Sequence, residues 1–240
     1  DAVINLAGES IAGKRWTAKQ KARILSSRID STRAIIEAIG KAVKKPKALV
    51  NQSAVGYYGN IEYGEVTEEH PRGLDFLSDV AEKWEKEALK AEAFGVRVVL
   101  PRTGVVLDKS AGALQKMLVP FKLFFGGPLG SGNQWFPWIH LQDEIGALIF
   151  AAENQNLRGP VNLAAPESVT MKQFCQALGK AMNRPSWAPV PGFVLKTVLG
   201  EMADSLLLGG QRAIPGKLLE SGYKFRFPKL PEALADIFMV

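Results

Sequence analysis

The sequence predicts an α/β protein built on a doubly wound parallel sheet. Three short, mostly apolar segments, the first of them rich in β-branched residues, indicate buried strands: Ala2–Leu6, Ala48–Gln52 and Val96–Leu100. The stretches between them repeat apolar residues at helical spacing, as Ile29, Ile35, Ile36 and Ile39 do. This alternation of strand and helix is typical of a parallel sheet covered by helices.

Local signals place each element of this first part. The first strand runs into Ala7-Gly8, a turn without bulk, and Thr17 is a helix cap. We expect that helix to reach Val43 with a break near Ser26-Ser27. The elements that follow are the strand Ala48–Gln52, a loop from Ser53 to Gly73, a helix from Phe76 to Ala93 and the strand Val96–Leu100.

The composition of the sequence changes past Leu107, where the predicted loops are longer and glycine and proline become frequent. Helices are expected over 114–124, 142–153 and 170–183, with a short strand over 161–163. We therefore assign residues 1–110 to the sheet domain and 111–240 to a smaller C-terminal α+β domain, some of whose segments return to the sheet.

Composition excludes several function classes. The net charge of +6 is scattered, and the densest basic cluster (Lys41, Lys44, Lys45 and Lys47) follows a predicted helix C-terminus, where cations are favourable. We therefore expect no nucleic-acid partner. No apolar run approaches the ~18 residues of a membrane span. The single cysteine, Cys175, is expected in the core and fits a reducing compartment such as the cytoplasm.

The candidate chemistry lies at the ends of the predicted strands. Two histidines and one cysteine lack metal-binding spacing, so no metal site is expected. Ala7-Gly8, Ser53 and Thr103-Gly104 each follow a strand, and ligands bind at the carboxyl ends of parallel strands. If the strands are neighbours, these residues line one crevice. Ser53 has an equally good alternative role as a turn hydroxyl.

Several segments together resemble the extended short-chain dehydrogenases/reductases. DAVINLAGE, SAVGYYG, VVLPRTGVVL and WIHLQDEIGALIFA occur in the order of that superfamily's motifs. With DFLSDVAEKWE and GGPLGSGNQWFPWIH, the chain resembles one atypical epimerase-like subfamily over nearly its whole length. That group includes the human 39U member, bacterial YfcH-type proteins, and cyanobacterial and plastid SulA-like proteins.

The resemblance implies a Rossmann sheet and a nicotinamide cofactor, NADP in preference to NAD. It also implies a preceding segment of roughly 50–60 residues with the Gly-rich phosphate loop, which makes the sheet in this chain incomplete. The residues implied to contact the cofactor are Leu6, Ala7, Gly8, Ser53, Arg102, Thr103 and Gly104.

The chain departs from the superfamily at the Tyr-x-x-x-Lys pair, in which the lysine cation favours the phenolate. None of the four tyrosines has a lysine four residues later. On the expected helix the spacing falls on Phe76 and Val80, or on Leu77 and Ala81 if the register slips by one. Any turnover would then use Ser53 as a hydrogen-bond donor and Tyr58 or a water as the proton source.

The Gly-rich loop supplies the candidate substrate residues. Trp135 and Trp138 either form an apolar wall of a substrate cleft or pack into the second domain. His140 is either a buried, hydrogen-bonded histidine or a proton donor near that cleft. Asp143 is expected as a helix cap or a first-turn carboxylate.

Two functions remain open from the sequence. One is an NAD(P)-binding oxidoreductase or epimerase-like enzyme that acts on an unknown carbonyl or hydroxy substrate with altered proton chemistry. The other is a catalytically silent nucleotide-binding regulator, for example of cell or plastid division. A homodimer is compatible with either, and the plastid stroma replaces the cytoplasm if the source is a plant.

Overall fold

The computed structural model describes residues 1–238, and its central sheet is parallel throughout. Strand β1 (Ala2–Asn5) pairs with β2 (Ala48–Asn51), which pairs with β5 (Arg97–Thr103). Strand β3 (Ser53–Ala54) continues the β2 register along the same edge of β5. On the other edge of β5 lies β9 (Gly159–Leu163).

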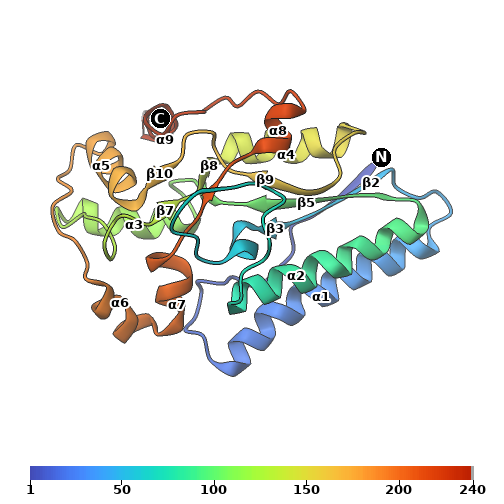
Figure 1. Ribbon diagram of the computed structural model, residues 1–240, viewed down its shortest axis with the longest axis horizontal. Coiled ribbons are helices and arrows are strands. Elements are labelled where there is room, and N and C mark those ends of the chain that lie inside the picture. Colours follow the sequence, from blue (N-terminus) through green and yellow to red (C-terminus); the bar gives the residue numbers. More distant parts are fainter. Residues whose placement is uncertain (239–240) are drawn as a thin grey trace.

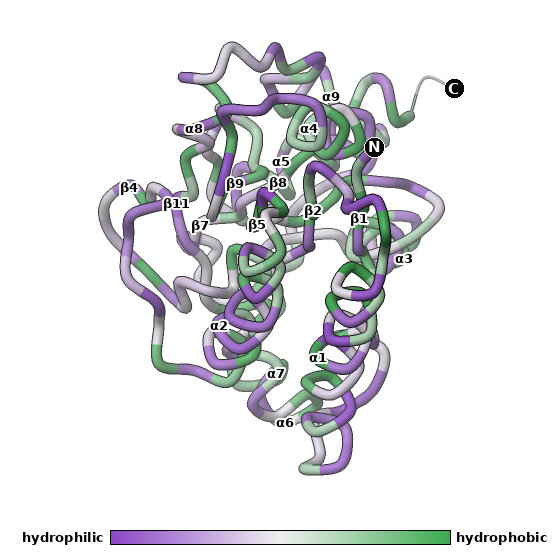
Figure 2. The backbone as a smooth tube through the Cα atoms, turned by 90° about the vertical axis from the view of Figure 1, so that its right-hand side faces the viewer, coloured by the Kyte–Doolittle hydropathy of each residue, from purple (hydrophilic) through white to green (hydrophobic). Residues whose placement is uncertain are grey.

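Helices cover both faces of this sheet, as Figure 1 shows. Helices α1 (Ala18–Lys41) and α2 (Phe76–Leu89) pack side by side on one face, and α4 (Leu141–Glu153) crosses the other (Figures 1 and 2). The buried strand residues Leu49, Val98 and Leu100 meet the α1–α2 layer, whereas Val50 and Val99 meet α4. The predicted doubly wound fold is confirmed.

The expected break in the first helix is wrong, because α1 is continuous from its cap at Thr17 to Lys41. The hydroxyls of Ser26 and Ser27 donate to the carbonyls of Arg23 and Ile24, so they bond back to the same helix. Ser27 Oγ also accepts the amide of Glu9 at 2.9 Å, which ties the turn after β1 to this helix.

A second core lies beyond the sheet and is built around α3 (Gly112–Lys122), α5 (Met171–Ala181) and α9 (Leu230–Phe238). Cys175 is buried in it, as expected. Two small pairings lie outside the main sheet: β6 (Val105–Leu107), which follows β5, pairs with β8 (Trp138–His140), and β7 (Trp135–Phe136) pairs with β10 (Val169–Thr170).

The remaining elements are short. Strand β4 (Glu65–Val66) pairs with β11 (Arg212–Ala213), so the loop after β3 is partly ordered by the C-terminal region. The others are the 3₁₀ helices Val55–Tyr58 and Lys90–Phe94, the π-helical turn Asp204–Leu208, and helices α6 (Gly192–Leu199), α7 (Glu201–Ala203) and α8 (Gly216–Glu220). The proposed domain boundary near residue 110 stays a prediction; β9 and α4 both lie on the main sheet.

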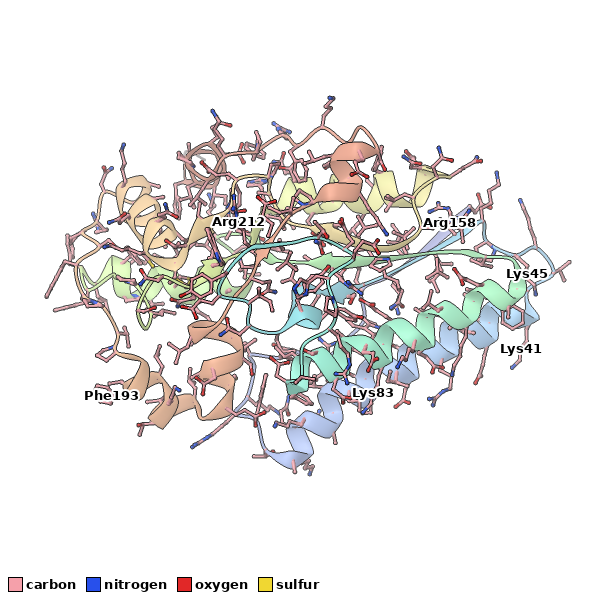
Figure 3. The ribbon with its side chains drawn as sticks, in the orientation of Figure 1. Lys41, Lys45, Lys83, Arg158, Phe193 and Arg212 are labelled. Atoms are coloured by element: carbon pink, nitrogen blue, oxygen red, sulfur yellow. The ribbon has the colours of Figure 1, made fainter. Side chains whose placement is uncertain are left out.

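The basic residues labelled in Figure 3 are scattered over the molecule: Lys83 lies on α2 and Arg212 on β11, and Arg158 directly precedes β9. Lys41 is the last residue of α1, and Lys45 in the following loop donates its Nζ protons to the carbonyls of Gly40 and Ala42. This agrees with the expected role of the lysine cluster at a helix C-terminus. None of the helices within residues 1–238 is long and apolar enough to span a bilayer.

Candidate functional site: a cavity at the strand ends

A cavity of about 410 Å³ lies at the carboxyl ends of the parallel strands. Three neighbouring strands each contribute two residues to its wall at their carboxyl ends. These are Leu6 and Gly8 after β1, Gln52 and Ser53 after β2, and Thr103 and Gly104 at the end of β5. The volume lies within the ~300–1,000 Å³ typical of small-molecule sites. The structure therefore brings together the three strand ends that the sequence singled out.

Not every candidate residue reaches this cavity. Leu6, Gly8, Ser53, Thr103, Gly104 and Trp135 line it. Ala7, Tyr58, Arg102, Trp138 and His140 are outside its wall.

A buried amide cluster supports the wall next to β1. Asn5 Nδ2 donates to Asn51 Oδ1 at 2.6 Å, and Trp84 Nε1 donates to Thr32 Oγ1 at 2.9 Å. Thr32 in turn donates to Asn51 Oδ1, so β1, β2, α1 and α2 share one network. Asn5 Oδ1 also accepts the amide of Ala7, which orients the turn toward the cavity. Such a satisfied network holds the Trp84 ring on the cavity wall.

Ser53 lines the cavity, but its hydroxyl proton is directed elsewhere. Ser53 Oγ donates to Glu85 Oε1 at 2.6 Å, and Glu85 forms a two-pronged ion pair with Arg102 at 2.8 Å for each bond. All three side chains are buried. In this arrangement Ser53 offers a ligand its lone pairs, and donation to a ligand, the role expected from the sequence, requires the hydroxyl to rotate.

Arg102 and Tyr58 belong to the interior network behind Ser53. Arg102 Nη1 donates to Tyr58 Oη at 3.0 Å, and Tyr58 donates to Asn162 Oδ1 at 2.6 Å. The Arg102 guanidinium lies 3.5 Å from the centre of the Tyr57 ring. Burial, opposed by Arg102, raises the pKa of Tyr58 to about 12. Tyr58 is therefore a hydrogen-bonded core residue, and its phenol is held away from the cavity wall.

The helix α2 presents an apolar face to the cavity. Leu77 and Ala81 line it at the i, i+4 spacing, as do Val80 and Trp84. Phe76 instead packs edge-on against Trp16, with a ring-centre distance of 5.0 Å. Of the two registers left open by the sequence, only Leu77 and Ala81 place both members on the wall, and neither can carry a proton.

The aromatic loop divides between the cavity and the core. Trp135 and Phe136 line the cavity, whereas Trp138 is 1 % exposed and belongs to the second core. Trp138 lies in β8, which is buried against β6, and its indole donates to Glu167 O at 3.0 Å. Because β8 pairs with β6, Trp138 is buried and packs in the second core.

His140 caps helix α4 instead of reaching the cavity. Its Nδ1 accepts the amide of Gln142, its Nε2 lies 3.3 Å from Asp236, and its ring stacks on Phe227. Burial lowers its pKa despite the Asp236 charge. Asp143 is in the first turn, as expected, and its carboxylate accepts the amides of Arg226 and Phe227. Both residues fasten the C-terminal tail.

Gly104 has a packing role that the sequence did not indicate. A Cβ at this position would lie 2.7 Å from the carbonyl oxygen of Pro137. The next amide, Val105 N, donates to that same carbonyl at 2.7 Å. Gly104 therefore allows the aromatic loop to lie against the end of β5.

Several polar residues that line the cavity were missed from the sequence: Arg28, Gln52, Asn60, Asp75, Asp204, Ser205 and Gln211. Gln52 lines the wall and donates to Thr103 Oγ1 at 2.6 Å, and Thr103 donates to the buried Glu144 at 2.8 Å. Arg28 also lines the cavity, with its guanidinium 5.0 Å from the Trp84 ring centre. Only the position of Gln52 directly after a strand could have indicated a role; nothing in the local sequence marks Glu144 or Arg28.

These features match a known class of protein: the chain belongs to the NAD dependent epimerase/dehydratase family, whose model matches residues 1–164. A second model, a domain of unknown function (DUF1731), matches residues 190–237. The family match covers the sheet and most of the cavity wall, and the second match covers the part of the wall formed by residues 204–206 and 209–211.

Within that family, the similar proteins carry the name epimerase family protein, among them an SDR39U1 homolog. The chain is 45% identical over 238 residues to the epimerase family protein YfhF of Bacillus subtilis, covering 99% of this chain and 78% of the relative. It is 44% identical to the chloroplastic SDR39U1 homolog of Arabidopsis thaliana, covering 98% of this chain and 68% of the relative. The crystal structure of human SDR39U1 with NADPH matches with a TM-score of 0.94 at 39% identity, covering all of this chain and 82% of that one. The expected subfamily is confirmed.

Proposed function

We propose that this protein is an NADP(H)-binding oxidoreductase or epimerase-like enzyme, which transfers hydride to or from a small carbonyl or hydroxy substrate without a tyrosine–lysine pair. The observation that carries this proposal is the cavity at three parallel strand ends, where Gly8, Ser53, Thr103 and Gly104 meet. Open α/β sheets bind nucleotides at this place.

The chain's own residues fit the nicotinamide-bearing part of the cofactor. Gly8 leaves the backbone bare at the wall, and the Arg28 cation beside it suits an anionic ribose-phosphate. The aromatic and aliphatic side chains of Trp135, Leu77 and Val80 suit a flat ring. When bound, the nicotinamide would supply or accept the hydride. The human relative crystallised with NADPH supports NADP(H) over NAD(H).

Direct titration with NADPH and NADH, followed by nicotinamide fluorescence, tests cofactor binding. Gly8→Leu places a side chain against Arg28 in the cavity and should weaken NADPH binding about tenfold or more, equivalent to ~1.4 kcal/mol. Gly13→Leu is the matched control, since Gly13 is exposed in the same segment and outside the cavity. The titrations use the full-length protein, because the resemblance implies that the phosphate loop precedes these residues. Equal weakening in both variants, or no binding to the unaltered full-length protein, would overturn the assignment.

The alternative function, a nucleotide-binding regulator, is supported by the α2 face of the cavity. Leu77 and Ala81 lie there at the spacing of the tyrosine–lysine pair, and neither can donate a proton. A screen of aldehydes, ketones and nucleotide sugars with bound NADPH separates the two functions. Turnover in the ordinary enzyme range of ~1–10³ per second supports the enzyme. Tight NADPH binding without turnover on any of these substrates favours the regulator.

A further inference from the structure

The cavity communicates with a buried carboxylic acid through one hydroxyl group. Thr103 lines the cavity and its Oγ1 donates to Glu144 Oε1 at 2.8 Å. Glu144 itself is 6 % exposed and is outside the cavity wall. Gln52, also on the wall, donates to the same hydroxyl at 2.6 Å. Thr103 is thus the hydrogen-bonded link between a ligand space and an acid.

Two buried acceptors beside this link have no donor among residues 1–238. Glu144 Oε2 and Gln52 Oε1 are both without a hydrogen-bond partner there. Leaving such atoms unpaired is unfavourable. A proton on Glu144 would convert one acceptor into a donor, so the site favours a protonated acid or a ligand that supplies a donor.

The surroundings leave Glu144 close to the point where it gains or loses a proton. Burial, opposed by the hydrogen bonds from Thr103 and Gln52, raises the pKa of Glu144 to about 7. Its place in the first turn of α4 favours the anion, because the helix N-terminus is positive. The groups that face or adjoin it are Gln52 and Thr103 from the sheet, Tyr223 from the tail, and Asp143 and His140 at its own helix start.

We propose that Glu144 and Thr103 form a proton relay to the cavity, in which Glu144 holds the proton that accompanies hydride transfer and Thr103 passes it to or from the ligand. This inference rests on the proposed function and deepens it. It gives the site a proton acceptor at the end of β5, in place of the tyrosine–lysine pair that α2 lacks.

The relay is balanced in both directions. In the oxidation of a hydroxyl substrate, the substrate O–H bond breaks and its proton bonds to Thr103 Oγ1. The proton that Thr103 held passes to Glu144, which becomes a neutral acid. The C–H electron pair leaves as hydride to the oxidised nicotinamide nucleotide. Carbonyl reduction runs through the same steps in reverse.

The acid can be observed in the protein without any ligand. Infrared difference spectra should show a protonated carboxyl band that titrates near pH 7 and is absent in Glu144→Gln. Glu153→Gln is the matched control, since Glu153 is exposed on the same helix. Thr103→Val removes one donor to the carboxylate and should move the midpoint upward, whereas Thr103→Ser should restore it. A band unaffected by Glu144→Gln would overturn the proposal.

The coupling to the cavity is tested by proton release. The oxidised nicotinamide ring is positively charged, so NADP⁺ binding should drive protons off Glu144, by at most about half a proton at pH 7, since a group with that pKa is half protonated there. NADPH should release none. Proton release should vanish in Glu144→Gln and persist in Glu153→Gln. If a substrate is found, Thr103→Val should lower kcat with little change in KM.

The outcomes separate this inference from the proposed function. If neither NADP⁺ nor NADPH binds, the proposed function fails and the relay fails with it. If both bind but Glu144→Gln releases as many protons as the unaltered protein, only the relay is overturned. If Glu144→Gln does not fold, the midpoint shift in Thr103→Val decides, and an unshifted midpoint contradicts the relay.

Discussion

Ser53 Oγ donates to Glu85 Oε1 at 2.6 Å, so the serine at the cavity is tied to the ion pair beneath it. Glu85 is held at the same time by Arg102, and all three side chains are buried. The bond links β3 to α2 across 32 residues of sequence. The hydroxyl therefore has a structural role whether or not a ligand is bound.

Replacing Ser53 by alanine should destabilise the protein by about 1.5–3 kcal/mol, the usual range for a hydrogen bond to a charged group. Urea unfolding measures this loss. Ser26→Ala, at an exposed position on α1, is the control and should change the free energy of unfolding by less than about 0.5 kcal/mol. A Ser53→Ala variant of unaltered stability that loses NADPH affinity would show that the hydroxyl serves the ligand alone.

Trp135 and Trp138 should respond differently to truncation. Trp138→Ala leaves a large void in the second core and should cost about 3–5 kcal/mol of folding free energy. Trp135→Ala should cost less, since this side chain is only half buried, and should weaken ligand binding at the cavity. Thermal melts and NADPH titrations of both variants make the comparison. If Trp138→Ala lost ligand affinity but kept its full stability, Trp138 would be a substrate residue and not a packing residue.

Restoring the tyrosine–lysine pair should work only in the register that faces the cavity. Leu77→Tyr with Ala81→Lys places both groups on the wall at i, i+4. If proton transfer limits the reaction, turnover should rise about 10²–10⁴-fold, the usual contribution of a positioned acid. Leu77→Phe with Ala81→Lys is the control without the phenol. A rise in both variants would mean that the lysine or the added bulk, and not the phenol, is responsible.

The stability of the protein should depend on pH through Glu144. The unfolded chain releases this proton near the ordinary value of 4.5, whereas the folded protein holds it to about pH 7. The contribution of Glu144 to the free energy of unfolding therefore falls as the pH rises from about 4.5 to about 7. One pKa unit corresponds to about 1.4 kcal/mol, so the total is about 3 kcal/mol.

Glu144→Gln should lack this fall and should gain stability over the unaltered protein above pH 7. Urea unfolding at pH 4.5, 6 and 8 measures the difference. Glu153→Gln, on the same helix but exposed, should follow the unaltered protein at each pH. A parallel pH dependence in Glu144→Gln would place the titrating group elsewhere.

Local signals account for the parts of the fold that the sequence predicted. Thr17 accepts the amide of Gln20 as a helix cap, and Thr170 forms a complete capping box at α5. Short apolar runs marked the strands, and each strand end carries a small or polar residue. Such signals need only neighbouring residues. They also sufficed to show that no tyrosine has a lysine four residues later.

The expected break at Ser26-Ser27 shows the limit of such signals. Serines compete with helix formation in an isolated segment, yet here both hydroxyls bond back to the helix. One of them also receives Glu9 from the turn after β1. That second contact joins segments 18 residues apart, which no local pattern encodes.

By itself, then, the sequence determined the parallel sheet, the small residues at its strand ends and the absence of a tyrosine–lysine pair. Only the tertiary structure decided which face of α2 meets the cavity, that Trp135 rather than Trp138 lines it, and where Ser53 directs its proton. It also joined Glu144 to Thr103 across 41 residues. The physical reason is that burial and hydrogen bonding between distant segments set these roles, and both depend on how the layers pack.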